Sequence, residues 1–406
     1  MRLSTGVTSS WLLRTSALIA MGLCAISGGA FAHEITSLGY LADAAHKSQV
    51  DADHLVPPLK LKWSRDLGVY ASYPIVKDGL VFITAGDATV CNNVTELMAL
   101  DLKTGDTVWQ HDISSLYCWS NAAYTDGHLA VITTNGQISG FSADRTGQQL
   151  WSTQLPVQYL FYTPPTGYKG QIFVGGGGYS GTVYAVDAAN GNLNWMANIE
   201  GDGASPPAIG DGGVYVSYPC QSYKFDILTG EQKWRYQNGC EGGGGAPPIY
   251  LKHRVYTNDG FSNFVVLDSR TGLPIGHRPA DQPSAVWTDS NGKDFLMVVL
   301  DGTLRCLSLP KGQLQWTFSA GADNYVSSAP LVIGNTVAIA SFNDIHHNGA
   351  IFMLDAATGN ELWSGDLYTG FEQPYAGPIN GLGAGRDTLL VPSGYLISAY
   401  VSKHRH

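Results

Sequence analysis

The chain has 406 residues, a formal net charge of −10, 49 glycines and 11% aromatic residues. An acidic chain without a basic run is unsuited to nucleic acid or to an anionic membrane surface, so the sequence excludes both as partners. Abundant glycine together with many aromatic residues indicates turn-rich β structure rather than disorder.

Residues 1–32 have the pattern of a secretory signal peptide. Arg2 and Arg14 give a basic start, a short apolar run follows, and Ala-Phe-Ala at 30–32 is a small-x-small cleavage site. The apolar run is too short for a comfortable membrane span, and no second run follows it. We therefore expect export to the periplasm or beyond without a membrane span, a retained anchor being the alternative. A polar N-terminal arm at 33–58 would follow, as a short helix or without fixed structure.

A single pattern recurs seven times in residues 59–406: an Asp, a turn glycine four residues later, and a Trp four residues after that. Five copies keep the Asp and six keep the Trp. Glycine allows the positive φ of a tight hairpin, and the Asp carboxylate can accept hydrogen bonds from the turn amides. The Trp ring is too large for one small sheet to bury, so it should pack against a neighbouring sheet. The turn glycines are Gly105, Gly147, Gly191, Gly230, Gly272, Gly312 and Gly359.

Two short apolar strands precede each turn, so each unit has four strands in about 40 residues, the period of a propeller blade. The Trp series runs from Trp63 to Trp363, and the sequence after Trp363 supplies only three more strands. The strand around Trp63 would be the missing fourth. The sequence therefore predicts an all-β, eight-bladed β-propeller of four-stranded antiparallel blades. Its last blade is closed by the N-terminal strand, which protects sheet edges, and we expect a monomer.

The repeats "ALDLKTGDTVW" and "AVDAANGNLNW" resemble the tryptophan-docking repeat of the pyrroloquinoline-quinone-like propellers. The resemblance extends over residues 59–402. It implies the fold and leaves the function open, because that superfamily includes quinoprotein dehydrogenases and cofactor-free scaffolds alike. An oxidoreductase of this kind would hold the quinone in the central funnel with Ca²⁺ beside it. No C-x-x-C-H motif is present, so its electrons could not pass to a covalent haem in this chain.

The cysteines indicate which face of the propeller carries elaborated loops. In a blade of strands A to D the Thr-Gly turns join C to D, so the B–C loops and D–A links lie on the opposite face, here called the top face. Cys91 and Cys118 fall in a B–C loop and the next D–A link, and Cys220 and Cys240 repeat this relation. We predict disulfides Cys91–Cys118 and Cys220–Cys240, which export permits, with unrelated buried thiols as the alternative. Cys306 lies at a small core position of a strand and should be a free thiol.

The D–A links also carry aromatic residues that would ring the funnel. Such a funnel could bind a planar cofactor, a sugar or an extended peptide, whereas the alternative is that many of these rings only pack between blades. Asp323 or Glu372 could act there as a base or metal ligand. The predicted ligand-binding residues are Trp119, Tyr159, Tyr162, Tyr325, Phe371 and Tyr375.

His346 and His347 lie in a B–C loop that should approach the link containing Glu372. Histidines facing a carboxylate could bind a metal or move a proton, although adjacent surface histidines are more often only solvated. The sequence favours an exported propeller that binds a protein, polymer or small-molecule ligand on its top face. The alternatives are a quinone- and Ca²⁺-dependent oxidoreductase, or a propeller enzyme acting on polysaccharide with one of these histidines as base.

Overall fold

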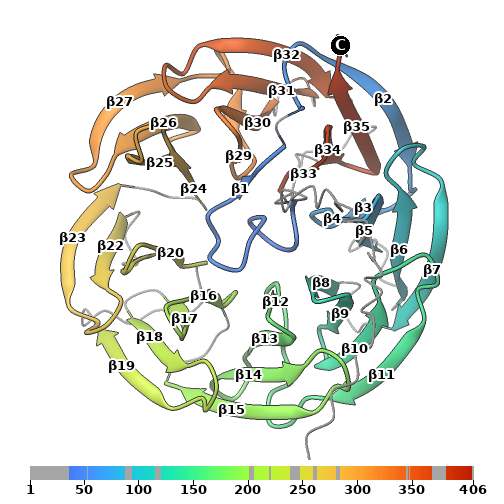
Figure 1. The fold of residues 1–406 in the computed structure, drawn as a ribbon, viewed down its shortest axis with the longest axis vertical. Coiled ribbons are helices and arrows are strands. Elements are labelled where there is room, and N and C mark those ends of the chain that lie inside the picture. Colours follow the sequence, from blue (N-terminus) through green and yellow to red (C-terminus); the bar gives the residue numbers. More distant parts are fainter. Residues whose placement is uncertain are drawn as a thin grey trace, which may run out of the picture. The chain divides into compact units, whose positions relative to one another are not determined.

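The computed structural model describes residues 36–52, 54–86, 94–114, 120–200, 205–218, 221–237, 247–258, 263–279, 284–343, 346, 348–367 and 381–404. These residues form strands and turns without a helix, and so none of them forms a helix long and apolar enough to cross a membrane. Eight antiparallel blades stand in a ring (Figure 1). The predicted fold class is confirmed.

Blades 1 to 4 follow one another in chain order, each with its first strand innermost and its last outermost. Blade 1 has a split inner strand. Its strands are β3 (Tyr70–Ala71), β4 (Ile75–Lys77), β5 (Leu80–Gly86), β6 (Val94–Asp101) and β7 (Thr107–Ser114). Blade 2 has β8 (Ser120–Thr125), β9 (His128–Thr133), β10 (Gln137–Ser142) and β11 (Gln149–Gln154). Blade 3 has β12 (Thr166–Tyr168), β13 (Gln171–Gly176), β14 (Gly181–Asp187) and β15 (Leu193–Ile199). Blade 4 has β16 (Ala208–Gly210), β17 (Gly213–Tyr218), β18 (Gln221–Asp226) and β19 (Gln232–Gln237).

Blades 5 to 7 continue this order, and blade 8 completes the ring. Blade 5 has β20 (Ile249–Leu251), β21 (Arg254–Asn258), β22 (Asn263–Asp268) and β23 (Pro274–Pro279). Blade 6 has β24 (Ala285–Thr288), β25 (Asp294–Leu300), β26 (Thr303–Ser308) and β27 (Gln313–Phe318). Blade 7 has β28 (Tyr325–Val326), β29 (Leu331–Ile333), β30 (Thr336–Asn343), β31 (Asn348–Asp355) and β32 (Glu361–Leu367). Blade 8 has β33 (Gly383–Gly385), β34 (Thr388–Ser393), β35 (Leu396–Ser402) and β2 (Leu59–Asp66).

The ring closes through the N-terminal strand. Strand β2 pairs antiparallel with β35, with Trp63 opposite Ala399, and so becomes the outer strand of blade 8. The backbone N–H of Lys403 extends this pairing by donating to the Pro58 carbonyl at 2.8 Å. The prediction that the segment around Trp63 completes the last blade is confirmed.

Tryptophans dock blades onto their neighbours, except in blade 5, where Gly276 stands at the Trp position. The contact between blades 3 and 4 illustrates this docking. The Trp195 indole Nε1 of blade 3 donates to the Ile227 carbonyl of blade 4 at 3.1 Å. Gly230, in the same turn, has φ +70°, and a Cβ placed on it would lie 2.6 Å from the Trp195 ring. The turn therefore needs glycine both for its backbone conformation and for contact with the indole. Asp226 accepts the turn amides of Leu228 and Thr229 through Oδ1, as expected from the repeat.

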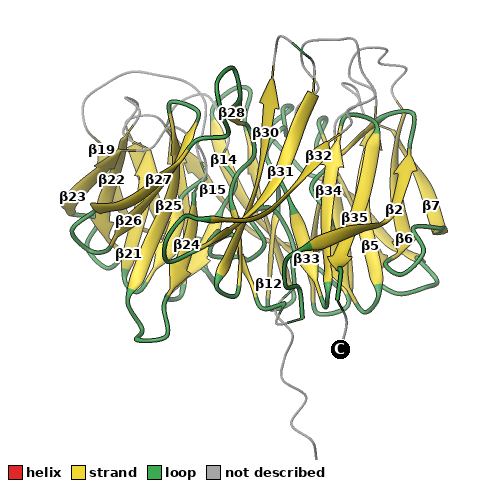
Figure 2. Cartoon of the chain, turned by 90° about the horizontal axis from the view of Figure 1, so that it is seen from above, coloured by secondary structure: helices red, strands yellow, loops and turns green. Residues whose placement is uncertain are grey.

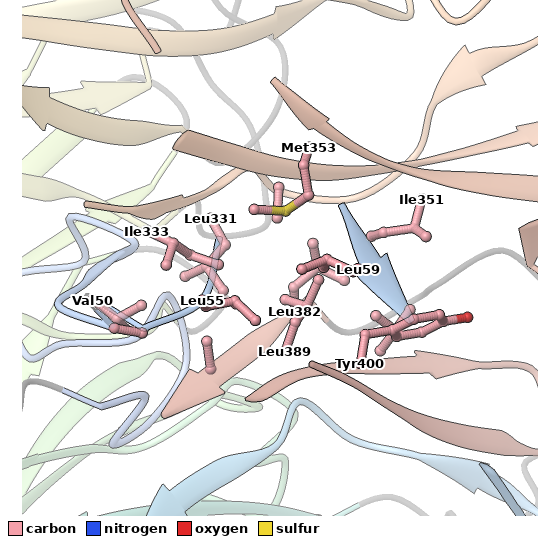
Figure 3. Packing of buried hydrophobic residues seen from close by; sticks show 14 of the residues in the cluster. Val50, Leu55, Leu59, Leu331, Ile333, Ile351, Met353, Leu382, Leu389 and Tyr400 are labelled. Atoms are coloured by element: carbon pink, nitrogen blue, oxygen red, sulfur yellow. The ribbon is translucent and has the colours of Figure 1, made fainter. Parts of the chain in front are cut away.

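The hydrophobic core is divided into clusters that lie between neighbouring blades. Figure 3 shows the cluster between blades 7 and 8, to which Met353 of β31, Leu389 of β34 and Tyr400 of β35 all belong. Val50 and Leu55, which precede the first blade strand, belong to the same cluster and are almost completely buried. The segment before β2 is therefore part of the folded core.

That segment, residues 36–52 and 54–58, will be called the arm, and it crosses the centre of the ring (Figure 1). The sequence predicts a short helix or no fixed structure for it. Its described residues instead form turns and the short strand β1 (Gln49–Val50), which pairs in parallel with β29 of blade 7. Single backbone hydrogen bonds to successive inner strands hold this irregular path, a feature that a periodic sequence pattern cannot reveal.

His46 is the most deeply buried titratable side chain of the arm. Its Nδ1 lies 3.0 Å from the Pro248 carbonyl of blade 5, so the neutral ring can donate there. Its Nε2 lies 3.3 Å from Oγ1 of Thr166 in blade 3. Burial lowers the pKa of His46 to about 4, with the Pro248 hydrogen bond and the Asp43 carboxylate opposing the shift. The uncharged imidazole thus joins the arm to blades 3 and 5.

Candidate functional site

The two faces of the propeller differ in their connections. Short turns containing the Thr-Gly repeat join the third and fourth strands on the bottom face. Figure 2 shows β30, which leads into a B–C loop, pointing to the opposite rim, the top face. Some of the residues that the sequence analysis predicts for this face lie outside the part of the chain that the structure describes. They are Cys91, Cys118, Trp119, Cys220, Cys240, His347, Phe371, Glu372 and Tyr375.

The described top face carries an exposed group of aromatic residues on blade 3. Tyr159 and Tyr162, in the link from β11 to β12, are 49% and 44% exposed. Tyr179, in the loop from β13 to β14, is 81% exposed. The Tyr159 and Tyr179 rings meet edge to face with centroids 5.0 Å apart. Exposed rings on one blade, two of them in contact with each other, mark a candidate contact surface. Tyr159, Tyr162 and Tyr179 are called the tyrosine platform.

Backbone and side-chain hydrogen bonds fix the two segments that carry the platform. Leu160 and Gly177 exchange backbone hydrogen bonds of 3.0 and 2.8 Å, which joins the link to the loop. The buried Gln158 side chain donates to Thr182 Oγ1 at 2.9 Å and accepts from the Tyr179 N–H at 3.1 Å. The backbone of the two segments is therefore held in place before any ligand arrives, which lowers the entropic cost of binding.

Gly178 explains how the two rings approach one another. Its φ is +131°, a conformation that side chains with a Cβ rarely adopt. A Cβ on this residue would also lie 2.6 Å from Cε1 of Tyr159. The glycine thus permits both the loop conformation and the ring contact.

Tyr325, Asp323 and His346 lie on blade 7 or on the link that leads into it. Tyr325 is 39% exposed, and its ring meets Phe342 edge-on at 6.2 Å. Asp323 is exposed in a turn with φ +64°, and the exposed His346 follows β30. Blades 3 and 7 stand across the ring from each other (Figure 1), so the structure does not gather these candidates with the tyrosine platform into one cluster.

Two other aromatic residues of the D–A links, Tyr73 and Phe161, pack between blades and do not line the funnel as the sequence predicted for aromatic residues of these links. Tyr73 is 3% exposed, and its hydroxyl donates to the Ala122 carbonyl at 2.6 Å. Phe161 is 1% exposed and packs on Tyr184. For these two rings the packing alternative is correct. Cys306 is a buried free thiol, as predicted, and burial raises its pKa to about 12, which leaves it unreactive.

A quinone cofactor of the predicted kind needs a cation site beside it. Nowhere within the described ranges do three His, Cys, Asp or Glu side chains come together to bind a metal ion. His346 is described, but its suggested co-ligands His347 and Glu372 are not. The described residues therefore leave the Ca²⁺ site of a quinone cofactor unassigned. They offer aromatic contact surface and hydroxyl groups.

Tyr179 is a candidate site residue that the sequence did not single out, although a signal was present. It follows the four glycines of the run "GGGGYSG", whose glycines suggest a close backbone approach and whose only large side chain is this tyrosine. The run lacks the Lys-Ser/Thr of a phosphate loop, which removes the commonest functional meaning of such glycines. An aromatic residue at the end of a glycine run in a B–C loop is the feature that could have indicated it.

The sequence is similar to two groups of proteins. A family model described as "Outer membrane protein assembly factor BamB" matches residues 96–180 and 134–291. The chain is 27% identical over 283 residues to the outer membrane protein assembly factor BamB of Burkholderia pseudomallei, covering 62% of this chain and 66% of that protein. It is 24% identical over 344 residues to the dehydrogenase subunit of a quinone alcohol dehydrogenase from Gluconacetobacter polyoxogenes, covering 76% and 42%. The chain thus spans just under two thirds of the first relative and less than half of the second.

Solved structures show the same fold in both groups. A europium-containing methanol dehydrogenase superposes with a TM-score of 0.67 at 16% identity, covering 82% of this chain and 85% of that one. BamB from Moraxella catarrhalis superposes with a TM-score of 0.62 at 15% identity, covering 84% and 99%. At such low identity the structural likeness establishes the fold and leaves the activity open.

Proposed function

Because the chain belongs to the pyrroloquinoline-quinone-like β-propeller superfamily, we propose that it is an exported scaffold that binds a protein partner on its top face. The observation that carries the proposal is the tyrosine platform, in which Tyr159 and Tyr179 stay exposed although their segments are rigidly braced. Tyrosine is enriched at the energetic centres of protein interfaces, because it buries a large rigid surface and keeps a polar tip. The likeness to an assembly factor supports the same class of function.

The rest of the geometry agrees with a scaffold. The tryptophan docking and the closed ring make the blades rigid, while the top loops differ from blade to blade. Variable loops on a rigid scaffold are where binding usually resides. The bottom turns repeat one short sequence and provide little to distinguish partners. A polymer or small-molecule ligand at the same platform would leave no protein adduct in the test below and so would count against the proposal.

The test places a photoactivatable cross-linking amino acid at Tyr179 or at Leu228 of the exported protein in cells. Leu228 is the matched control, because it is 74% exposed but lies in a bottom turn of blade 4. We expect a discrete protein adduct from position 179 and none from position 228. Absence of an adduct at 179, or the same adducts at both positions, would refute the proposal.

A second function, quinone-dependent oxidation, is favoured by the similarity to the alcohol dehydrogenase subunit. When bound, a quinone would supply the two-electron acceptor, and this chain would have to bind and orient it. No three His, Cys, Asp or Glu side chains come together among the described residues, so none of them is assigned to the accompanying cation. Purified protein mixed with pyrroloquinoline quinone and Ca²⁺, then desalted, tests this function directly. A retained quinone absorbance would support the oxidoreductase, and complete loss of the chromophore would exclude quinone binding under these conditions.

A further inference from the structure

The arm engages the inner strands of the blades at one repeated position. In seven blades a residue of the inner strand donates its backbone N–H to the arm. This residue is the second of the short inner strand, and in the longer β8 it is the residue at the equivalent position. Six donate to arm backbone carbonyls at 2.6–3.1 Å, and Ala384 donates to Ser37 Oγ at 2.9 Å. The seven donors are Val76, Tyr124, Ile209, Tyr250, Val286, Val332 and Ala384.

Blade 3 is the exception. The corresponding residue of β12 is Gly167, which pairs with Ile172 just as Tyr250 pairs with Val255 in blade 5. Its N–H should therefore point away from β13, towards the arm. Within the described ranges, however, no arm atom accepts a hydrogen bond from it. The arm instead folds into a turn at this point, closed by its own bonds from Ala42 N to Gly39 O and from Asp43 N to Leu41 O.

A cavity of about 350 Å³ occupies this gap. The arm, blade 2 and blade 3 line it, with Tyr40, Ala42, Gly167, Tyr168 and Lys169 among the lining residues. Its volume is within the range of natural small-molecule sites, about 300–1,000 Å³. It lies at the ends of the inner strands that lead into the bottom turns, away from the tyrosine platform.

The lining groups indicate which ligand chemistry would fit. The half-buried Gly167 N–H is a donor from which no described arm atom accepts, and the exposed Lys169 ammonium lies 5.1 Å from the centre of the Tyr168 ring. Lys47 also lines the cavity, but it pairs with Asp43 at 3.2 Å. Asp126 is exposed at the blade 2 side and would repel any negative charge in the cavity. The lining can therefore accommodate at most a single carboxylate.

We propose that this cavity binds a small monocarboxylate with an apolar body. One carboxylate oxygen would accept the Gly167 N–H that the arm leaves unbonded, and the Lys169 ammonium would compensate the charge. The apolar body would lie against the rings of Tyr40 and Tyr168. The proposal is independent of the protein-binding function assigned to the top face.

The first test compares hydrogen exchange of matched backbone amides in the intact exported protein. Without ligand, Gly167 should exchange at least about tenfold faster than Ile209, Tyr250 and Val286, which donate to the arm. Adding 3-phenylpropanoate at millimolar concentration should slow Gly167 and leave the other three unchanged. Equal protection of all four amides without ligand, or no response of Gly167 to the acid, would overturn the assignment.

The second test is calorimetry with the acid and with 3-phenylpropanol, which has the same body but no carboxylate. The acid should bind and the alcohol should bind at least about tenfold more weakly, since it loses the charge-assisted bond. Lys169→Met keeps the side-chain length and removes the cation. It should weaken binding of the acid to a similar degree without lowering the melting temperature of the protein. Equal binding of acid and alcohol, or an acid affinity unchanged by Lys169→Met, would contradict the proposal. Gly167 itself is unsuitable for substitution, because a Cβ there would lie 2.2 Å from the Tyr124 carbonyl oxygen.

Discussion

Acid should weaken the protein in part through one residue, His46. The ring is fully buried and its pKa is lowered from 6.5 to about 4, mainly because burial disfavours the charged form. The unfolded chain therefore binds a proton at higher pH than the folded one does. The stability that His46 contributes is fully present above pH 6.5 and is lost as the pH falls from 6.5 to about 4.

The size of this effect follows from the shift. A difference of about 2.5 pKa units at about 1.4 kcal/mol per unit is roughly 3 kcal/mol of unfolding free energy. The variant His46→Gln keeps an amide donor for the Pro248 carbonyl but does not titrate. Its absolute stability will be lower, so only the pH dependence of each protein is compared.

The assay is urea unfolding of the wild type and His46→Gln at about pH 7.5 and about pH 4. The wild type should lose roughly 3 kcal/mol more than the variant over this interval, because every other titrating group is shared. An equal loss in both proteins would refute the reasoning. It would mean either that the ring is protonated in the folded state, or that Asp43 and the Pro248 carbonyl compensate its burial.

The other predictions concern the ring and its bridges. Trp195→Ala should lower the free energy of unfolding by about 3–5 kcal/mol, because it leaves a cavity between blades. Tyr179→Ala should hardly change the melting temperature. Equal losses of stability in the two variants would contradict the docking role of Trp195. Deleting residues 59–66 should expose the edge of blade 8 and cause aggregation, and a soluble, cooperatively folded product would count against closure. Non-reducing peptide mapping should find the two predicted disulfides, each contributing about 3 kcal/mol, and should find Cys306 unbridged.

The blades were predictable because they are periodic and local. The turn glycine, its Asp and the docking Trp recur at fixed spacing, and each has the same physical role in its own blade. Even the closure by Trp63 followed from counting a strand that the last unit lacked. For the other blades the spacing sufficed, since strands that are neighbours in the chain are also neighbours in space.

The arm and the tyrosine platform were beyond such reasoning. The arm is fixed by single contacts to distant inner strands, such as His46 to Pro248, 202 residues apart in sequence. No periodic pattern encodes contacts of that kind. In the platform, Tyr179 meets Tyr159 only because Gly178 and Gln158 set the loop and the link against each other. The sequence analysis predicted Tyr159 as a binding residue and did not predict Tyr179.

We propose that the tyrosine platform is the surface that binds the protein partner. The most direct measurement is the dissociation constant of the partner captured at position 179, determined for wild type, Tyr179→Ala and Leu228→Ala. Tyr179→Ala should weaken binding by roughly 10- to 100-fold, as expected for an interface anchor worth about 1–3 kcal/mol, and Leu228→Ala should leave it unchanged. Unchanged affinity in Tyr179→Ala, or equal losses in the two variants, would contradict the account.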